Sequence, residues 1–128
     1  VIIGAEYGEG KRQGWLTSFY LACYDKGELK EIGKVSTGLK ELESEGVSFK
    51  QMTDLLEPLI INTKGKYVEV KPEIVIEVAY EEIQKSPSYS SGYALRFPRF
   101  LRLRTEEKTI KDINTLEDVE RLYKSQNN

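Results

Sequence analysis

The segment Ala94–Arg104, ALRFPRFLRLR, holds four of the six arginines in the chain and no acidic residue. The 128-residue chain has a formal net charge of -2, so this segment concentrates positive charge that the rest of the chain lacks. Guanidinium groups bind phosphate through two parallel hydrogen bonds and also stack on flat rings. Proteins that enter the minor groove combine such arginines with an apolar wedge between base steps. The pattern therefore indicates that Arg96 and Arg99 bind phosphates while Phe97 wedges against bases.

Strand alternation explains only part of this segment. Leu101 and Leu103 would face a core, while Arg102 and Arg104 would face water. The same phase carried backward would bury Arg99, and an unpaired buried charge is strongly destabilising. We therefore expect the alternation to break upstream of the two leucines.

Pro98 is the residue at which the strand phase can break, because proline cannot donate to a sheet ladder and occurs at edges and bulges. We expect the corner Phe97–Arg99 to project from the protein instead of filling its core. One alternative stays open at this point. The segment could be an edge strand whose charges only confer solubility, with Phe97 tucked under a loop.

Two further basic spots accompany the arginine segment. Lys11 and Arg12 lie in the glycine-flanked turn GEGKRQGW, where the backbone could approach an anion closely. Lys34 lies in GKVSTG (33–38), which lacks the spacing of a phosphate-binding P-loop and is better interpreted as a strand and a turn. These three residues are candidate nucleic-acid contacts.

The residue types that are missing limit the chemistry of the chain. There is no histidine, which removes the usual general base and the commonest zinc ligand. The lone Cys23 excludes an internal disulfide and any Cys-x-x-Cys metal site. The acidic residues are scattered, as solvated surface charges are. We expect no independent catalysis, no metal site, and no membrane span, since no apolar run is long enough for one.

Local patterns place the secondary structure. Period-2 alternation and turn residues predict strands over residues 17–25, 28–38, 66–70 and 74–82. Ser48 and Gln51 have the spacing of a capping box and predict a helix that ends near Pro58. Thr115 caps a second predicted helix that runs to Lys124, with acids in its first turn.

This order of elements favours a mainly β fold. Five or six short strands, a helix inserted after the third and a helix at the end suit a small closed barrel of the oligonucleotide/oligosaccharide-binding (OB) type, which hides its strand edges. An open sandwich would show similar alternation. The length fits one domain over residues 1–128. Because the chain opens in mid-strand at Val1, we expect it to be a piece of a longer protein.

Over nearly its whole length the sequence resembles the C-terminal OB domain of ATP-dependent DNA ligases of the archaeal and eukaryotic replicative type. Residues 1–25 resemble the opening hairpin of that domain, and GKVSTG resembles its Gly-Lys-Val-Gly-Thr-Gly strand. QKSPSY followed by ALRFPRFLRLR resembles the stretch that leads into the last nucleotidyltransferase motif.

The resemblance implies an activity for the parent enzyme. Such an enzyme would attach AMP to its own lysine with ATP and magnesium, pass the AMP to a 5′-phosphate at a nick, and join that phosphate to the 3′-hydroxyl. The Lys-x-Asp-Gly motif that carries the nucleophile is absent from this sequence, as are the adenylation and N-terminal DNA-binding domains. We therefore expect the isolated chain to be inactive and to bind no cofactor.

The resemblance also implies roles for individual residues. In one orientation the domain would lie in the minor groove opposite the nick, using Arg96, Phe97 and Arg99, with Lys11, Arg12 and Lys34 as further DNA contacts. In the other it would cap the ATP pocket, where the final motif orients the departing pyrophosphate. The candidates for that role are Arg102, Arg104 and Lys108. The family motif ends Arg-x-Asp-Lys, whereas residues 104–108 read RTEEK, one residue longer.

Two alternative functions remain open: the chain could be the OB domain of an mRNA-capping guanylyltransferase, or a stand-alone single-strand nucleic-acid-binding domain. The guanylyltransferase has no need of a Phe-Pro wedge, and single-strand binders usually spread several stacking aromatics along a basic groove. The expected partners are nicked double-stranded DNA, the adenylation domain of the same chain and, through the missing region, a sliding clamp. The expected location is the cytoplasm, at the nucleoid, in a prokaryote, or the nucleus in a eukaryote.

Overall fold

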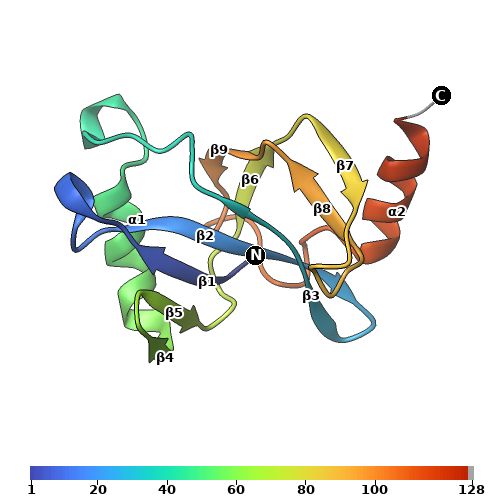
Figure 1. The fold of residues 1–128 in the computed structure, drawn as a ribbon, viewed down its shortest axis with the longest axis horizontal. Helices are drawn as coiled ribbons and strands as arrows, with labels where there is room; N and C mark the ends of the chain where they lie inside the picture. The colour runs from blue at the N-terminus through green and yellow to red at the C-terminus, as the bar shows by residue number, and fades with distance from the viewer. Residues whose placement is uncertain (127–128) are drawn as a thin grey trace.

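The computed structural model describes residues 1–126 as a mainly β fold with helices at its two ends (Figure 1). Within these residues the strands are β1 Ile2–Tyr7, β2 Leu16–Asp25, β3 Glu28–Val35, β4 Ile60–Lys64, β5 Tyr67–Val70, β6 Ile76–Ala79, β7 Glu82–Lys85, β8 Tyr93–Arg96 and β9 Arg99–Leu103. The α-helices are α1 Phe49–Leu56 and α2 Leu116–Ser125, and short 3₁₀ helices cover Gly10–Arg12, Glu43–Glu45 and Glu57–Leu59. No helix in this part of the chain has the length and apolarity to cross a membrane.

The strands form three antiparallel sheets. The largest has the order β3-β2-β1-β5-β4, while β6 pairs with β9 and β7 with β8. The prediction of a closed barrel is therefore wrong in this respect, because the described ladder does not close on itself. The mainly β fold with one inserted and one C-terminal helix is confirmed.

The predicted strand 74–82 is in fact two strands, and the reason lies opposite it. Ala79 pairs with Arg99, and Glu82 pairs with Arg96, so two residues on each side have no paired residue opposite them, although the Glu81 N–H still donates to the Arg96 carbonyl at 2.9 Å. On one side these are Tyr80 and Glu81, and on the other they are Phe97 and Pro98. Since proline cannot donate to the ladder, one long hairpin breaks at this level into two short sheets.

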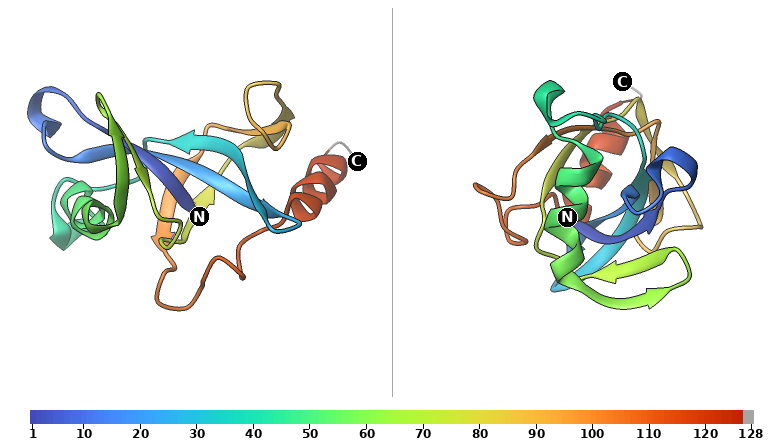
Figure 2. Two further views of the ribbon diagram at one scale, coloured as in Figure 1. Left: turned by 90° about the horizontal axis from the view of Figure 1, so that it is seen from below. Right: turned by 90° about the vertical axis from the view of Figure 1, so that its left-hand side faces the viewer.

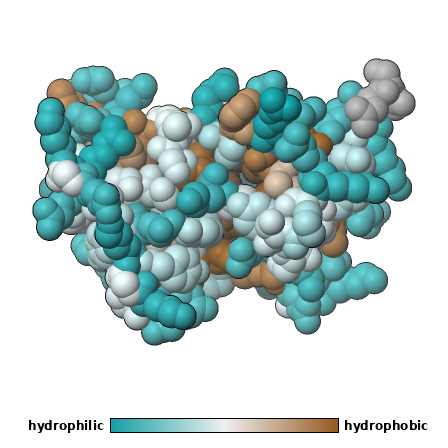
Figure 3. Space-filling model, viewed as in Figure 1, coloured by the Kyte–Doolittle hydropathy of each residue, from teal (hydrophilic) through white to brown (hydrophobic). Residues whose placement is uncertain are grey.

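The core packs against the five-stranded sheet and extends to Phe100 of β9. Its largest fully buried apolar side chains come from β1, β2, β3, β5, β7 and α1: Ile2, Leu16, Phe19, Val35, Phe49, Met52, Leu56, Val68, Val70 and Ile83. The helices α1 and α2 lie at opposite ends of this sheet (Figure 2). The face seen in Figure 1 is hydrophilic around its rim and exposes apolar residues mainly toward its centre (Figure 3).

Both predicted helices are present, with the expected caps. The Ser48 hydroxyl accepts a hydrogen bond from the Gln51 N–H at 3.0 Å, and α1 ends just ahead of Pro58. In α2 the Thr115 hydroxyl accepts from the Asp118 N–H at 3.1 Å, while the Asp118 carboxylate accepts from the Thr115 N–H at 2.9 Å. The hydrogen bond from the Thr115 N–H, followed by those from the Thr115 and Asn114 side chains, holds the pKa of Asp118 below its ordinary value of 3.8.

The far end of α2 is tied to β7 by one side chain. The Gln126 Oε1 accepts from the Ile83 N–H at 2.9 Å, and its Nε2 donates to the Ile83 carbonyl. Gln126 thus pairs with β7 as a neighbouring strand would and protects that peptide edge. Within α2, Val119 is buried in the core, whereas Leu122 is 44% exposed.

Candidate nucleic-acid interface

The corner between β8 and β9 projects into solvent. The Phe97 side chain is 66% exposed, and its backbone φ of 51° lies in the left-handed region, which bulky non-glycine residues rarely adopt. The expectation of a projecting corner is confirmed, and the alternative of a phenylalanine tucked under a loop is wrong. An exposed aromatic ring on a strained backbone is a candidate contact for a ligand, because such strain gathers at functional sites.

The two arginines beside the corner differ in their surroundings. Arg96 lies over the Phe97 ring, 5.0 Å from guanidinium carbon to ring centroid, and its Nη1 is 3.0 Å from the Glu82 carboxylate. Arg99 is exposed, and within residues 1–126 its side chain has no ion pair or hydrogen bond. Arg99 therefore offers a whole positive charge, while Arg96 must exchange a carboxylate for any phosphate it binds.

The strand phase after the corner differs from the prediction. Phe100 pairs with Val78, and Arg102 pairs with Glu77, so Leu101 is an extra residue in β9. This β-bulge turns Leu101 outward, where it is 46% exposed, and leaves Phe100 buried in the core. The prediction that Leu101 faces the core is therefore wrong, because the register shift lies one residue past Phe100.

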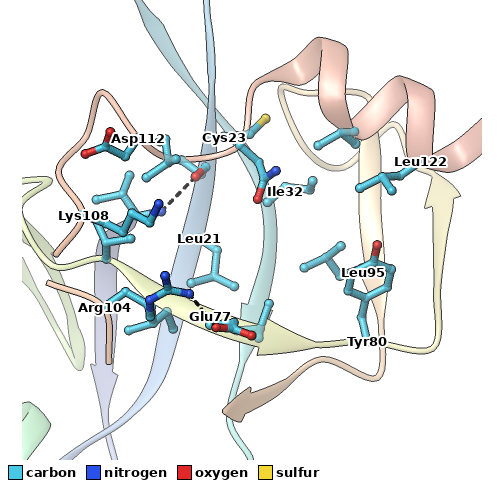
Figure 4. Close-up of a pocket in the computed structure, with 18 of the residues that line it drawn as sticks. Leu21, Cys23, Ile32, Glu77, Tyr80, Leu95, Arg104, Lys108, Asp112 and Leu122 are labelled. Atoms are coloured by element: carbon cyan, nitrogen blue, oxygen red, sulfur yellow. Dashed lines mark hydrogen bonds and ion pairs between the residues drawn. The ribbon is translucent and has the colours of Figure 1, made fainter. Parts of the chain in front are cut away.

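Glu77 joins the two arginines at the end of β9. Its Oε1 lies 3.2 Å from Arg102 Nε. The same atom lies 2.7 Å from Arg104 Nη1 (Figure 4). Arg104 Nε is also 2.6 Å from Glu107 Oε1, and these acids, Glu107 first, raise the pKa of Arg104. The Arg104 side chain is 25% exposed, so the prediction that it simply faces water is wrong. Sequence analysis missed Glu77, because its partners come from a distant strand.

Lys108 lies near Arg104 because of the turn that follows β9. The N–H groups of Glu107 and Lys108 both donate to the Arg104 carbonyl, at 3.1 and 2.8 Å. This turn accommodates the extra residue of RTEEK and keeps the two cations together. Within residues 1–126 the Lys108 side chain forms no ion pair or hydrogen bond, which leaves it the more available of the two cations.

Arg104 and Lys108 line one end of a cavity of about 510 Å³. Figure 4 shows these two cations together with Glu77 at that end, and Leu95, Tyr80 and Leu122 at the other. The wall between the two ends is apolar and includes residues of β2, β3 and β6. The cavity therefore has a charged end and an apolar end.

Of the remaining candidates, Lys11 is exposed, whereas the Arg12 side chain already contacts Glu41 and Phe49. Arg12 Nη2 lies 3.1 Å from Glu41 Oε1, and the guanidinium stacks over Phe49 of α1 at 4.5 Å from the ring centroid. Trp15 stacks on the same ring. Arg12 therefore fastens the turn between β1 and β2 to α1, and its charge is balanced by Glu41.

Lys34 lies on the outer face of the five-stranded sheet. Its Nζ is 3.6 Å from Glu6 Oε1 and 5.7 Å from the centroid of the Tyr20 ring. The Tyr20 hydroxyl donates to the same Glu6 carboxylate at 2.5 Å, and this hydrogen bond, with burial, raises the pKa of Tyr20 to about 12. Lys34 is thus placed on a tyrosine surface, separate from the corner.

The structure sorts the candidates into distinct places. Arg96, Phe97 and Arg99 gather at the start of β9, and Arg102, Arg104 and Lys108 gather at its end. Along the extended strand Arg99 lies about 10 Å from Arg102 and about 16 Å from Arg104. Lys11, Arg12 and Lys34 lie on other elements. Within residues 1–126 no group of three or more Cys, Asp or Glu side chains is placed to hold a metal ion.

Comparison with known proteins gives a consistent result. The family model "ATP dependent DNA ligase C terminal region" matches residues 12–107. The chain is 52% identical over 130 residues to a DNA ligase of Nanoarchaeum equitans, covering 98% of this chain and 23% of that protein. It is likewise 52% identical to a DNA ligase of Archaeoglobus fulgidus, covering 98% of this chain and 22% of that protein.

A solved structure shows the same arrangement. The ligase domain of LigD from M. tuberculosis superposes with a TM-score of 0.68 at 27% identity, covering 88% of this chain and 36% of that one. A mycobacterial DNA ligase D complexed with ATP and MES gives a TM-score of 0.65 at 25% identity, covering 90% and 36%. The chain spans only about a fifth of the length of the archaeal relatives it matches.

Proposed function

The chain belongs to the family of C-terminal regions of ATP-dependent DNA ligases, and we propose that within a longer ligase it grips nicked duplex DNA and assists the enzyme's own adenylation. The observation that carries the DNA-binding part is the projecting corner, where a 66% exposed Phe97 is flanked by two arginines. The family membership favours this function over a capping guanylyltransferase or a stand-alone single-strand binder.

The corner suits the minor groove of a duplex. An aromatic side chain that enters a groove can partly unstack one base step, and a nick lowers the cost of doing so because one backbone is already broken. Arg99, which has no acidic partner within the described residues, would anchor the corner on a phosphate. Arg96 would stay stacked on the ring and hold its orientation.

The opposite end of β9 suits a phosphate chain. When a lysine attacks the α-phosphate of ATP, negative charge accumulates on the departing pyrophosphate, and fixed cations stabilise it. Lys108 would supply one such charge, and Arg104 a second one held rigid by Glu77 and Glu107. Arg102 would be a third, held by the same Glu77. Magnesium would accompany ATP in the longer enzyme, and we assign it no ligand in this chain.

The two ends of β9 are too far apart to act on one phosphate group at the same time. We therefore propose that the domain presents the Lys108 end to the adenylation domain during lysine adenylation and the Phe97 end to DNA during sealing. Such an enzyme would work where the DNA is, at the nucleoid in the cytoplasm of a prokaryote. A sliding clamp would be bound by other parts of the longer protein.

The test uses the full-length ligase that carries this chain. Phe97→Ala should leave self-adenylation with labelled ATP unchanged and should slow the sealing of a nick that already carries AMP. Leu42→Ala is the matched control, since Leu42 is 59% exposed and lies in the loop before α1. Sealing by Phe97→Ala at the wild-type rate would contradict the proposal.

A further inference from the structure

The start of β9 is held on both of its edges. On one edge β9 pairs with β6, and on the other it meets the loop that follows β3. There the Phe100 N–H donates to the Thr37 carbonyl at 2.8 Å, and the Thr37 hydroxyl donates to the Pro98 carbonyl at 3.2 Å. Thr37, about sixty positions upstream, therefore forms hydrogen bonds with the residues on both sides of the exposed Arg99.

Gly38 lets this loop come close enough to make these bonds. Its φ is 99°, a conformation that favours glycine. A Cβ at this position would lie 2.4 Å from the Phe100 carbonyl oxygen and 2.7 Å from the Phe100 nitrogen. Both the backbone angle and the close approach exclude a side chain. The last glycine of GKVSTG is therefore needed for contact with β9, which explains this motif without a bound phosphate.

The corner needs such support. A left-handed φ in a phenylalanine persists only when its surroundings fix the backbone. The Phe97 ring cannot provide this support, because it is largely exposed and stacks against the Arg96 guanidinium of the same corner. The hydroxyl of Thr37 reaches the carbonyl of the very next residue, Pro98. The support therefore acts on the backbone and leaves the ring free.

We propose that Thr37 and Gly38 are positioning residues that fix the Phe97–Pro98 corner in the conformation that enters the duplex at a nick. This inference rests on the proposed function of the corner. If the corner already has its binding conformation, binding does not have to order its backbone. The Phe97 ring is then inserted between bases in a larger fraction of the complexes. Removing the contacts that Thr37 and Gly38 make with β9 lowers that fraction without removing any phosphate contact.

The experiment places 2-aminopurine in the template strand opposite the nick and follows its fluorescence as the full-length ligase binds. A wedging ring unstacks the probe and brightens it. Thr37→Val keeps the shape of the side chain and removes the hydroxyl. Loss of one neutral hydrogen bond predicts a fluorescence gain and a sealing rate that fall about two- to tenfold. Thr37→Ser, which keeps the hydroxyl, should restore both.

Three further measurements separate positioning from general stability. Thr37→Val should keep the wild-type salt dependence of nick binding and the wild-type rate of self-adenylation, because Arg99 and the Lys108 end are untouched. Thr63→Val, at an exposed position on β4, is the matched control and should behave as wild type. Gly38→Ala should lose the fluorescence gain more completely than Thr37→Val, since its Cβ meets the Phe100 backbone.

Phe97→Ala tells the failure of this inference from the failure of the proposed function. If Phe97→Ala keeps the full fluorescence gain, the corner does not wedge, and both proposals fall. If Phe97→Ala loses the fluorescence gain while Thr37→Val and Gly38→Ala keep it, Phe97 unstacks the bases but Thr37 and Gly38 do not position it. If Thr37→Val loses adenylation as well, and Thr37→Ser fails to restore sealing, Thr37 has only a structural role.

Discussion

Removing the charge of Arg99 should change how salt weakens the binding of nicked DNA. Each phosphate that a protein neutralises contributes about -0.9 to the slope of log affinity against log salt concentration. Because Arg99 has no acidic partner within the described residues, its full charge is available, and Arg99→Ala should make the slope shallower by about 0.9. At fixed salt, losing a charge-assisted hydrogen bond weakens binding by about tenfold or more.

Arg96→Ala provides the internal comparison. The Arg96 guanidinium is 3.0 Å from the Glu82 carboxylate, so binding a phosphate there first breaks an ion pair and releases fewer counterions from the DNA on balance. The slope should therefore change by less than 0.9, the full effect of one phosphate contact. Fluorescence anisotropy of a labelled nicked duplex, titrated at several salt concentrations, measures both slopes. An unchanged slope in Arg99→Ala, or a larger change in Arg96→Ala, would refute the assignment of Arg99 as the phosphate anchor.

Three other predictions follow from the same contacts. Lys11→Ala should flatten the salt slope more than Arg12→Ala does, since Glu41 balances the charge of Arg12; equal changes would contradict this. Glu77→Gln should lower the urea midpoint of unfolding modestly, because the neutral amide cannot balance two partly exposed arginines; an unchanged urea midpoint would argue against it. The pKa of Asp118 is depressed, so the stability it contributes is present above pH 3.8 and is lost as the pH falls through its folded pKa. The stability difference between wild type and Asp118→Asn should therefore shrink as the pH falls below 3.8. Thermal melts at several pH values measure this difference, and a difference that stays constant with pH would contradict the prediction.

The features that the sequence predicted well depend on neighbours along the chain. The caps of α1 and α2 need only residues three positions apart, and both were predicted. The projecting corner could be predicted because Pro98 cannot donate to a ladder and because Arg99 would otherwise be buried unpaired. In each case the physical cause lies within a few residues of its effect.

The features that the sequence missed depend on distant pairing. Strand β4 was not predicted, because its five residues are mostly exposed and acquire strand structure through pairing with β5. The split between β6 and β7 follows from Pro98 on the opposite strand. The bulge at Leu101 follows from the register with Glu77 and Val78. None of these partners can be identified from the local pattern.

The candidate site shows the same division. Residue types alone singled out the arginines and Phe97, but not the contacts that hold them. Glu77 lies within the predicted strand 74–82, and nothing in that pattern indicates that it joins Arg102 to Arg104. GKVSTG was interpreted as a strand and a turn, while its close approach to Phe100 depends on the folded structure. Supporting contacts of this kind are non-local and need coordinates.

The most direct test of the central claim, that the two ends of β9 serve different steps, is a comparison of two double variants in the full-length ligase. Single-turnover rates would be measured for self-adenylation with ATP and for sealing of a pre-adenylated nick. Phe97→Ala with Arg99→Ala should retain adenylation and lose sealing, whereas Arg104→Ala with Lys108→Ala should slow adenylation and retain sealing. If both double variants lose both steps equally, β9 only holds the domain together and the division of roles is wrong.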